Sequence, residues 1–213
     1  MIRADLHIHT IYSEDSNTPL DRIIARCLEV GTNCIAITDQ NTIAGALELK
    51  GMAPFNVIVG DEIQTSTGEV IGYFLEEEIP KGLPAEETAR MIKEQGGLVC
   101  IPHPFDRLRV STLRRQTLET LLPYIDIIEV FNSRVILLRH NVMAKRFTHT
   151  HGLLASAGSD AHTPVEIGNA YVEMPEFNNK DQFLTALAKG RIRGRRASPW
   201  VHLWSSWARL RSF

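Results

Sequence analysis

The sequence predicts an α/β fold in which helices cover a largely parallel sheet closed into a barrel. Short apolar segments alternate with helical segments along most of the chain, which is typical of parallel sheets with covering helices. Side chains of metal-binding type also follow several apolar segments, as reactive groups do at the C-terminal ends of barrel strands. These side chains are His7, His9, Asp15, Glu62, His103, Asp160 and His162.

Eight strands are expected, and each is a short apolar run of the kind found where both faces of a sheet are buried. They cover residues 3–6, 34–38, 56–59, 70–75, 98–101, 125–131, 153–157 and 170–174. The fourth strand is expected to pair with the third as a hairpin, because Thr67 and Gly68 form a turn between them.

Six helices are expected, five between these strands and one after the last strand. They cover residues 19–30, 42–50, 84–94, 113–122, 137–149 and 181–189. Proline at the first helical position and glycine after the last one mark several helix ends, as Pro19 and Gly31 do for the first helix. The barrel is expected to occupy residues 1–197 as a single domain.

Composition excludes few functional classes. The chain has 213 residues, of which 44% are hydrophobic, so it can bury a sizeable core. Its 23 basic and 25 acidic residues give a net charge of −2, so no overall field calls for a nucleic-acid partner. Cys27, Cys34 and Cys100 lack paired spacing, and Cys34 and Cys100 lie in apolar runs where buried thiols are expected, which favours a cytoplasmic setting. We expect neither a signal peptide nor a membrane span.

The two ends of the C-terminal region differ in character. Residues 189–196 form a basic run, which is either a contact for nucleic-acid phosphates or a solvated final turn. Residues 198–213 are expected to form an amphipathic helix that packs on the barrel or at a homodimer interface. Its apolar stripe comprises Trp200, Leu203, Trp204, Trp207 and Leu210. A membrane-surface helix is the alternative, although only two arginines accompany the stripe. Deleting residues 199–213 is expected to lower stability or break the dimer.

The metal-type residues predict a hydrolytic metal centre when they are taken together. His7 and His9 are two apart on a strand, so both imidazoles face one side. Asp160 and His162 repeat this spacing, although each residue alone could be structural. The set mixes imidazole with carboxylate and has no thiolate, which suits Zn²⁺, Mn²⁺ or Fe²⁺. Such ions generate hydroxide at neutral pH and clamp the oxygens of a phosphate ester.

These residues resemble the PHP family, the polymerase and histidinol phosphatase domain of metal-dependent phosphoesterases. The matching stretches are DLHIHT (5–10), YS (12–13), ITD (37–39), GDE (60–62), IPHP (101–104), IEVFN (128–132) and GSDAH (158–162). The resemblance implies a distorted seven-stranded β/α barrel with two to three divalent ions. It assigns the first ion to His7, His9, Glu62 and Asp160, the second to Glu62, His103 and Glu129, and the third to Asp15 and His162.

One position departs from the family pattern. The family usually has histidine after Thr-Asp in its second motif, whereas this chain has Gln40 after Thr38 and Asp39. A glutamine carbonyl is a far poorer ligand than imidazole for Zn²⁺ or Mn²⁺. The third ion is therefore expected to be weak, absent, or held by Asp15 and His162 with water.

The predicted reaction is hydrolysis of a small phosphomonoester or nucleotide by attack of a metal-bound hydroxide on phosphorus. Asp160 and His162 are candidates for proton transfer, and Arg134 and Arg107 for binding phosphate, with Arg109 nearby. Three alternatives stay open. They are exonuclease-like action on oligonucleotide ends, a degenerate barrel that serves as a binding or regulatory module, and hydrolysis of a C–N bond, which is disfavoured because no lysine follows a suitable strand.

Overall fold

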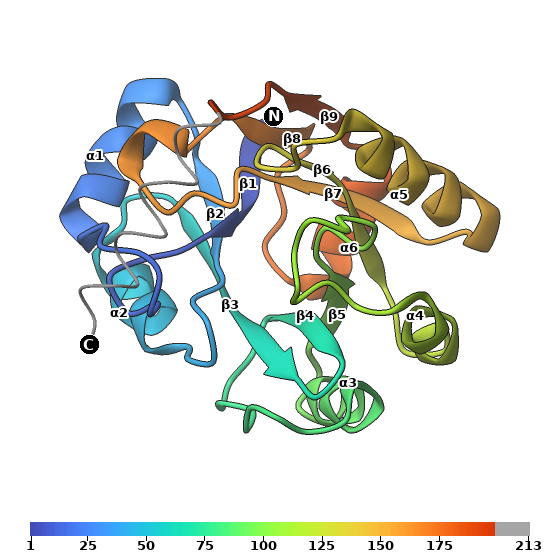
Figure 1. Cartoon of the computed structure of the whole chain (residues 1–213). Helices are drawn as coiled ribbons and strands as arrows, with labels where there is room; N and C mark the ends of the chain where they lie inside the picture. Colours follow the sequence, from blue (N-terminus) through green and yellow to red (C-terminus); the bar gives the residue numbers. More distant parts are fainter. Residues whose placement is uncertain (199–213) are drawn as a thin grey trace.

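The computed structural model describes residues 1–198, and these residues form one mixed sheet that curls into a nearly closed barrel (Figure 1). The strands follow the order β7-β6-β5-β4-β3-β2-β1-β8-β9. They are β1 (Ile2–Ile8), β2 (Cys34–Ile37), β3 (Asn56–Thr65), β4 (Gly68–Tyr73), β5 (Leu98–Ile101), β6 (Ile127–Asn132), β7 (Leu154–Gly158), β8 (Ala170–Met174) and β9 (Arg191–Gly194).

The barrel closes where the end of β1 meets the segment after β7. A parallel bridge joins Ile8 to Ala161 there. The amide of His9 donates to the Ala161 carbonyl at 2.9 Å, and the amide of Asp160 donates to the His7 carbonyl at 2.8 Å. The first and seventh strands are therefore joined at the residues that the sequence singles out as metal ligands.

Helices cover the outside of the barrel (Figure 1). They are α1 (Leu20–Val30), α2 (Ala44–Met52), α3 (Ala85–Glu94), α4 (Arg115–Leu121), α5 (Leu138–His151) and α6 (Lys180–Ala188), with the short 3-10 helix η1 at Pro164–Glu166. Glycines in the left-handed conformation end α1 at Gly31 and α5 at Gly152, with φ of 72° and 65°. All six predicted helices are present, with ends within about two residues of the prediction at most positions.

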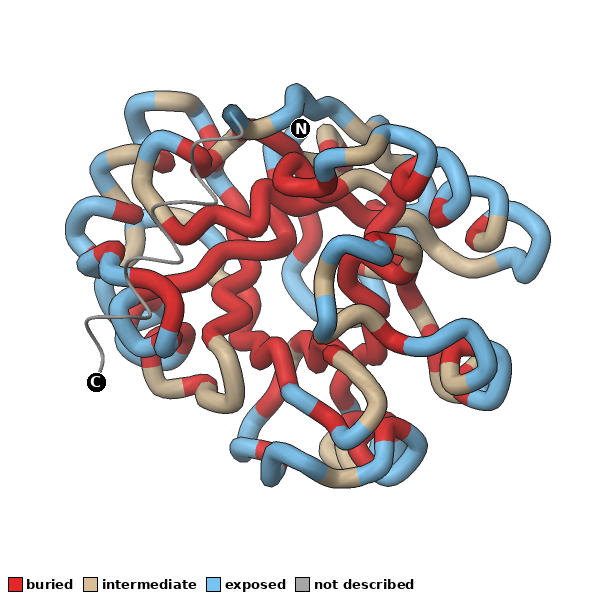
Figure 2. The backbone as a smooth tube through the Cα atoms, in the orientation of Figure 1, coloured by how far each residue is buried: buried red, intermediate tan, exposed pale blue. Residues whose placement is uncertain are grey.

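Apolar side chains pack on both faces of the sheet. Successive residues of β2 alternate between two apolar clusters, with Ile35 and Ile37 in one and Cys34 and Ala36 in the other. Figure 2 shows the resulting pattern, in which the central strands are buried and the exposed residues follow the outer helices and loops. Cys34 and Cys100 are buried free thiols, as expected, and Cys27 is a buried free thiol as well.

The structure differs from the sequence-based expectations in three ways. The expected hairpin pairs β3 with β4, but β4 is also antiparallel to β5, and β8 and β9 run antiparallel to their neighbours, so the sheet is mixed. Strand β3 extends to Thr65, so Glu62 lies within a strand and not after it. The basic run contains strand β9 instead of a solvated turn, since β9 pairs with β8 and Arg193 contacts Glu173 across that pair.

The predicted C-terminal helix lies almost wholly in residues 199–213, outside the described residues. Among the described residues, no helix is both long and apolar enough to cross a membrane.

Candidate metal centre

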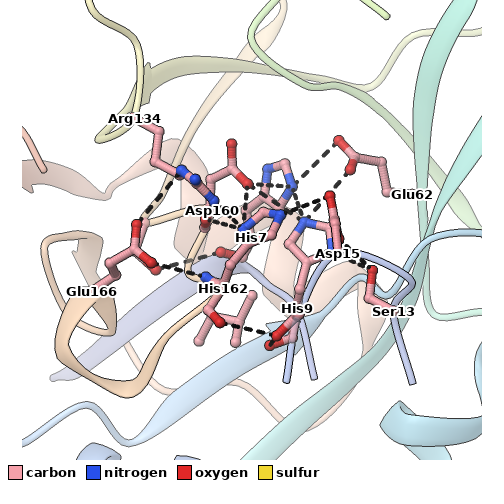
Figure 3. Close-up of polar contacts among 12 residues, drawn as sticks. His7, His9, Ser13, Asp15, Glu62, Arg134, Asp160, His162 and Glu166 are labelled. Atoms are coloured by element: carbon pink, nitrogen blue, oxygen red, sulfur yellow. Dashed lines mark hydrogen bonds and ion pairs between the residues drawn. The ribbon is translucent and has the colours of Figure 1, made fainter. Parts of the chain in front are cut away.

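All eight predicted metal ligands are buried, and the fold brings them to one end of the barrel. Figure 3 shows six of them, namely His7, His9, Asp15, Glu62, Asp160 and His162. Strand β1 supplies His7 and ends just before His9, and the loop that follows supplies Asp15. The other ligands come from β3, β6 and the segments that follow β5 and β7. They are Glu62, Glu129, His103, Asp160 and His162.

The first cluster comprises His7, His9 and Glu62, whose ligand atoms all lie within 4.8 Å of one another. The Nε2 atoms of the two histidines are 3.1 Å apart. Glu62 faces both of them, with Oε1 3.3 Å from His7 Nε2 and Oε2 3.5 Å from His9 Nε2. Two imidazole nitrogens and two carboxylate oxygens thus point toward a common volume, as ligands of one ion would.

Asp160 faces the same volume with one of its two carboxylate oxygens. Its Oδ1 lies 3.5 Å from His9 Nε2 and 3.7 Å from His7 Nε2, and it has no hydrogen-bond partner among the described residues. Its Oδ2 accepts hydrogen bonds from Asn132 Nδ2, at 3.1 Å, and from Arg109. The carboxylate is therefore held by one oxygen, and the other is available to a cation.

The second cluster comprises Glu62, Glu69 and His103. His103 Nε2 lies 3.2 Å from Glu62 Oε1 and 3.7 Å from Glu69 Oε2. Glu69 lies on β4, is 6% exposed, and was not among the predicted ligands. The hairpin register could have revealed it, because Glu62 pairs with Ile71 and Glu69 lies two residues from Ile71, hence on the same face as Glu62.

The third cluster comprises His9, Asp15 and His162. His162 Nε2 lies 3.0 Å from Asp15 Oδ2, and the rings of His9 and His162 have centroids 4.3 Å apart. Gln40 is next to this cluster, since its Nε2 donates to Asp15 Oδ2 at 3.4 Å. The amide of Gln40 thus contacts a carboxylate at the place where the family pattern would put an imidazole.

The donor set fits divalent ions. Besides Asp160 Oδ1, the buried atoms Glu69 Oε2 and His103 Nδ1 have no hydrogen-bond partner among the described residues. Buried carboxylates without such partners are costly unless a cation compensates them. No cysteine takes part in any cluster, which matches the preference of Zn²⁺, Mn²⁺ and Fe²⁺ for imidazole and carboxylate mixtures.

The pKa shifts reflect this crowding of charges. Burial alone would lower the pKa of His7, but Asp160, Glu129 and Glu62 raise it well above its ordinary value. Burial raises the pKa of Glu69 to about 7, and the negative charge of Glu62 adds to the effect. Burial, together with His9 and Arg134, lowers the pKa of His162 to about 4, so this imidazole is neutral at pH 7 and able to bind a metal.

Glu129 lies outside the three clusters and contacts the far side of the His7 ring. Its Oε1 is 3.1 Å from His7 Nδ1, and its Oε2 accepts the backbone amide of His103 at 2.8 Å. A carboxylate in this position fixes the orientation of an imidazole whose other nitrogen faces a metal site. Asp5, on the same strand as His7, accepts the backbone amides of Ser159 and Gly168.

Of the arginines considered for binding phosphate, Arg109 is better placed than the predicted Arg107 and Arg134. Arg107 is exposed on the loop after β5. Arg134 is 4% exposed, contacts Glu166 and lies beside His162 (Figure 3). Arg109, which the sequence places only near the site, contacts Asp160 with its guanidinium and keeps 22% of its side chain exposed.

The fold and the three buried clusters define an α/β barrel with a candidate multinuclear metal centre. The model of the PHP domain matches residues 5–146, and a PHP-associated model matches residues 139–192. This chain belongs to the PHP domain family. Two uncharacterized proteins of Methanocaldococcus jannaschii are similar to it. One is 37% identical over 181 residues, covering 83% of this chain and 72% of the relative, and the other is 45% identical over 117 residues, covering 49% and 68%.

Solved structures resemble the fold at low sequence identity. A two-domain protein from Bacteroides vulgatus, described as containing a predicted PHP-like metal-dependent phosphoesterase, has a TM-score of 0.73 at 16% identity, covering 91% of this chain and 65% of its own. PsfC from Pseudomonas syringae PB-5123 has a TM-score of 0.71 at 17% identity, covering 100% of both chains. Endonuclease Q in complex with a 27-mer duplex has a TM-score of 0.63 at 17% identity, covering 88% and 56%. This chain thus spans less than two thirds of the first and third of these structures.

Proposed function

We propose that this protein is a metal-dependent phosphoesterase that hydrolyses a small phosphomonoester or a nucleotide. The observation that supports this most directly is that the three clusters share residues. Glu62 belongs to the first and second clusters, and His9 to the first and third. A shared carboxylate suits two ions close together, which is the arrangement that clamps the attacking and leaving oxygens of a phosphate ester.

The ligands are assigned from the geometry of the clusters. The first ion is held by His7, His9, Glu62 and Asp160, and the second by Glu62, Glu69 and His103. Asp15 and His162, with His9, form a third and weaker site, because Gln40 supplies no imidazole. In this assignment Glu129 orients His7 and is not itself a ligand, which replaces its family-based role at the second ion.

When bound, divalent ions at these clusters lower the pKa of water and stabilise negative charge on phosphate oxygens. The protein's own side chains bind and orient the substrate. Arg109 contacts one phosphate oxygen from the open side of the centre, and Arg134 holds His162 and the Asp160 carbonyl in place from the buried side. Because Asp160 Oδ1 faces the first ion in this assignment, His162 is the candidate for proton transfer near the reacting atoms.

A cleft beside the third cluster offers room for the leaving group. It has a volume of about 520 Å³, and Tyr12, Gln40, Asn41 and Lys81 are among the residues that line it. Its size suits a nucleoside or a comparable small group. Substrates of this class are therefore the first to be tested.

The test measures metal content and hydrolysis of p-nitrophenyl phosphate on the same preparations, supplied with Mn²⁺ or Zn²⁺. The chain is compared with His7→Ala, which removes a ligand of the first ion, and with Gln40→His, which restores the family's imidazole. Turnover by the unaltered chain that is lost in His7→Ala supports the proposal and indicates that two ions suffice. Activity only in Gln40→His would make the third site essential.

Action on oligonucleotide ends is the second candidate. It is supported by the similarity in fold to endonuclease Q, whose structure contains a DNA duplex. Release of mononucleotides from single-stranded oligonucleotides, at rates above those for nucleoside monophosphates, would favour it. Bound metal without turnover of any phosphoester in a broad panel would instead favour a degenerate barrel with a binding or regulatory role.

A further inference from the structure

The loop after β5 places Arg109 beside the metal centre, and the contacts that fix this loop point to a role for two further residues. Arg109 Nε lies 3.6 Å from Asp106 Oδ2, and one terminal nitrogen contacts Asp160. The other terminal nitrogen has no hydrogen-bond partner among residues 1–198. A guanidinium carries five donors in a planar fork, so this arrangement leaves donors free for a phosphate oxygen.

Asp106 is in turn held by α5. Its Oδ1 lies 3.2 Å from His140 Nδ1, and both side chains are 3% exposed. The pair is neither part of a metal cluster nor on the surface, and it spans the gap between the loop and the first turn of α5. A buried carboxylate bound on one side by an imidazole and on the other by a guanidinium fixes the guanidinium in one place.

The rest of the loop is built around the same aspartate. The side chain of Asp106 accepts a hydrogen bond from the backbone amide of Leu108 at 3.2 Å. The backbone carbonyl of Asp106 accepts hydrogen bonds from the amide of Arg109 at 3.1 Å and from the hydroxyl of Thr112 at 2.9 Å. At the end of the loop, the Ser111 carbonyl accepts the amide of Glu69 at 2.9 Å, which ties the loop to a residue of the second cluster. The loop is therefore fixed relative to Asp160 through Arg109 and relative to the second cluster through Ser111.

We infer that Asp106 and His140 are positioning residues that hold the Arg109 guanidinium at the mouth of the metal centre for a substrate phosphoryl group. This inference rests on the proposed function in that it takes a phosphate ester as the substrate. Holding the guanidinium in place lowers the entropy lost when phosphate binds, which is how a residue remote from the substrate raises affinity.

The experiment is a double-mutant cycle on binding of inorganic phosphate to the Mn²⁺-loaded protein, measured by calorimetry and without turnover. Arg109→Ala is expected to weaken phosphate binding by about tenfold or more, and His140→Leu by roughly threefold to tenfold. The double variant should bind no more weakly than Arg109→Ala alone, because His140 acts only through Arg109. His140→Gln, whose amide can donate to Asp106, should recover most of the affinity.

Two controls separate positioning from general damage to the fold. His149→Leu, at an exposed position of the same helix, should leave phosphate binding unchanged, and metal content should be equal in all variants. If His140→Leu does not fold, Asp106→Asn takes its place in the cycle, since it keeps the size of the side chain and removes the charge.

Equal weakening by His140→Leu in the presence and absence of Arg109 would overturn the inference. Because the cycle needs no hydrolysis, it also distinguishes the two proposals. A wild-type protein that binds phosphate through this coupling but hydrolyses nothing contradicts only the enzymatic function. Hydrolysis without the coupling contradicts only the positioning roles.

Discussion

Two residues of the candidate metal centre adopt backbone conformations that residues other than glycine rarely adopt. His103 has a φ of 31° and Asp160 a φ of 55°, both in the left-handed region. Such residues cost on the order of 1–3 kcal/mol each and persist where the surrounding structure fixes them, commonly at functional sites. The backbone at the ends of β5 and β7 is thus shaped to aim these two side chains inward, at some cost in stability.

The buried carboxyl group of Asp61 is expected to make the stability of the protein depend on pH. It is fully buried, and burial together with the nearby Glu78 and Glu62 raises its pKa to about 8, although the backbone amide of Asn41 acts in the opposite direction. In the unfolded chain the group ionises near its ordinary value of 3.8. Between these values the folded protein retains a proton that the unfolded chain has released, so stability falls as pH rises.

The measurement is urea unfolding of the metal-free protein across this pH window. The stability of wild type relative to Asp61→Asn should fall by up to about 1.4 kcal/mol per pH unit. A difference that does not change between about pH 5 and pH 7 would show that Asp61 is ionised in the folded protein.

At the scale of single residues, the sequence predicts the candidate ligands that form recognisable spacings, follow an apolar strand or match a family motif, and it misses those with none of these signals. The pairs His7–His9 and Asp160–His162 stand out because a spacing of two places both side chains on one face. Glu69 and Arg109 carry no such signal, because their proximity to the centre depends on a hairpin register and on the path of a loop. The exposure of Arg107 could not be predicted for the same reason, since the turns of that loop cannot be derived from local sequence.

At the scale of elements, most helices and strands follow from the apolar pattern, whereas their pairing does not. The alternation of strands and helices predicts parallel neighbours, and β1-β2-β3 and β5-β6-β7 agree with this. The antiparallel strands β8 and β9 do not follow from that pattern. Strand β9 in particular is short and rich in arginine, so it lacks the apolar character that marks a buried strand.

The β3–β4 hairpin predicts that the second ion depends on Glu69. Glu69→Gln keeps the size of the side chain but removes a charged ligand, so the metal content at saturation should fall by about one ion per chain. Elemental analysis after dialysis against Mn²⁺ measures this. Glu87→Gln, on the exposed surface of α3, serves as the matched control and should leave the content unchanged. Equal contents in the two variants would contradict a ligand role for Glu69.

The contact between β1 and β7 gives a prediction about packing. A Cβ on Gly158 would lie 2.3 Å from His7 Cβ and 2.8 Å from Glu129 Oε1, so Gly158→Ala must displace the first ligand and its orienting carboxylate. We expect a loss of about 1–3 kcal/mol in stability together with weaker metal binding.

Gly51→Ala provides the contrast, since its Cβ would meet nothing within 4 Å inside α2. That change should stabilise the protein by roughly 0.5–1 kcal/mol. Thermal unfolding and metal titration of both variants test the pair, and a harmless Gly158→Ala would show that the strands can move apart.

At the scale of the whole molecule, metal binding should contribute to stability, because the clusters join strands that lie far apart in the sequence, from β1 to the segment after β7. One ion present at a hundred times its Kd adds about 2.7 kcal/mol, which corresponds to a rise in Tm of roughly 5–10 °C for a domain of this size. Calorimetry with Mn²⁺ and with a chelator measures the shift. The shift should be much smaller in His7→Ala, and an equal shift in that variant would place the stabilising ion elsewhere.

The way the barrel closes also has a consequence for the order of events during synthesis. The amides of His9 and Asp160 close the barrel, and the side chains of the same two residues face the first cluster. His7 and His9 leave the ribosome some 150 residues before Asp160. The first cluster therefore cannot be completed until the seventh strand has been synthesised. A nascent chain therefore exposes an open pair of histidines for most of its synthesis. We therefore expect the proposed ions to bind late, when the last candidate ligands dock.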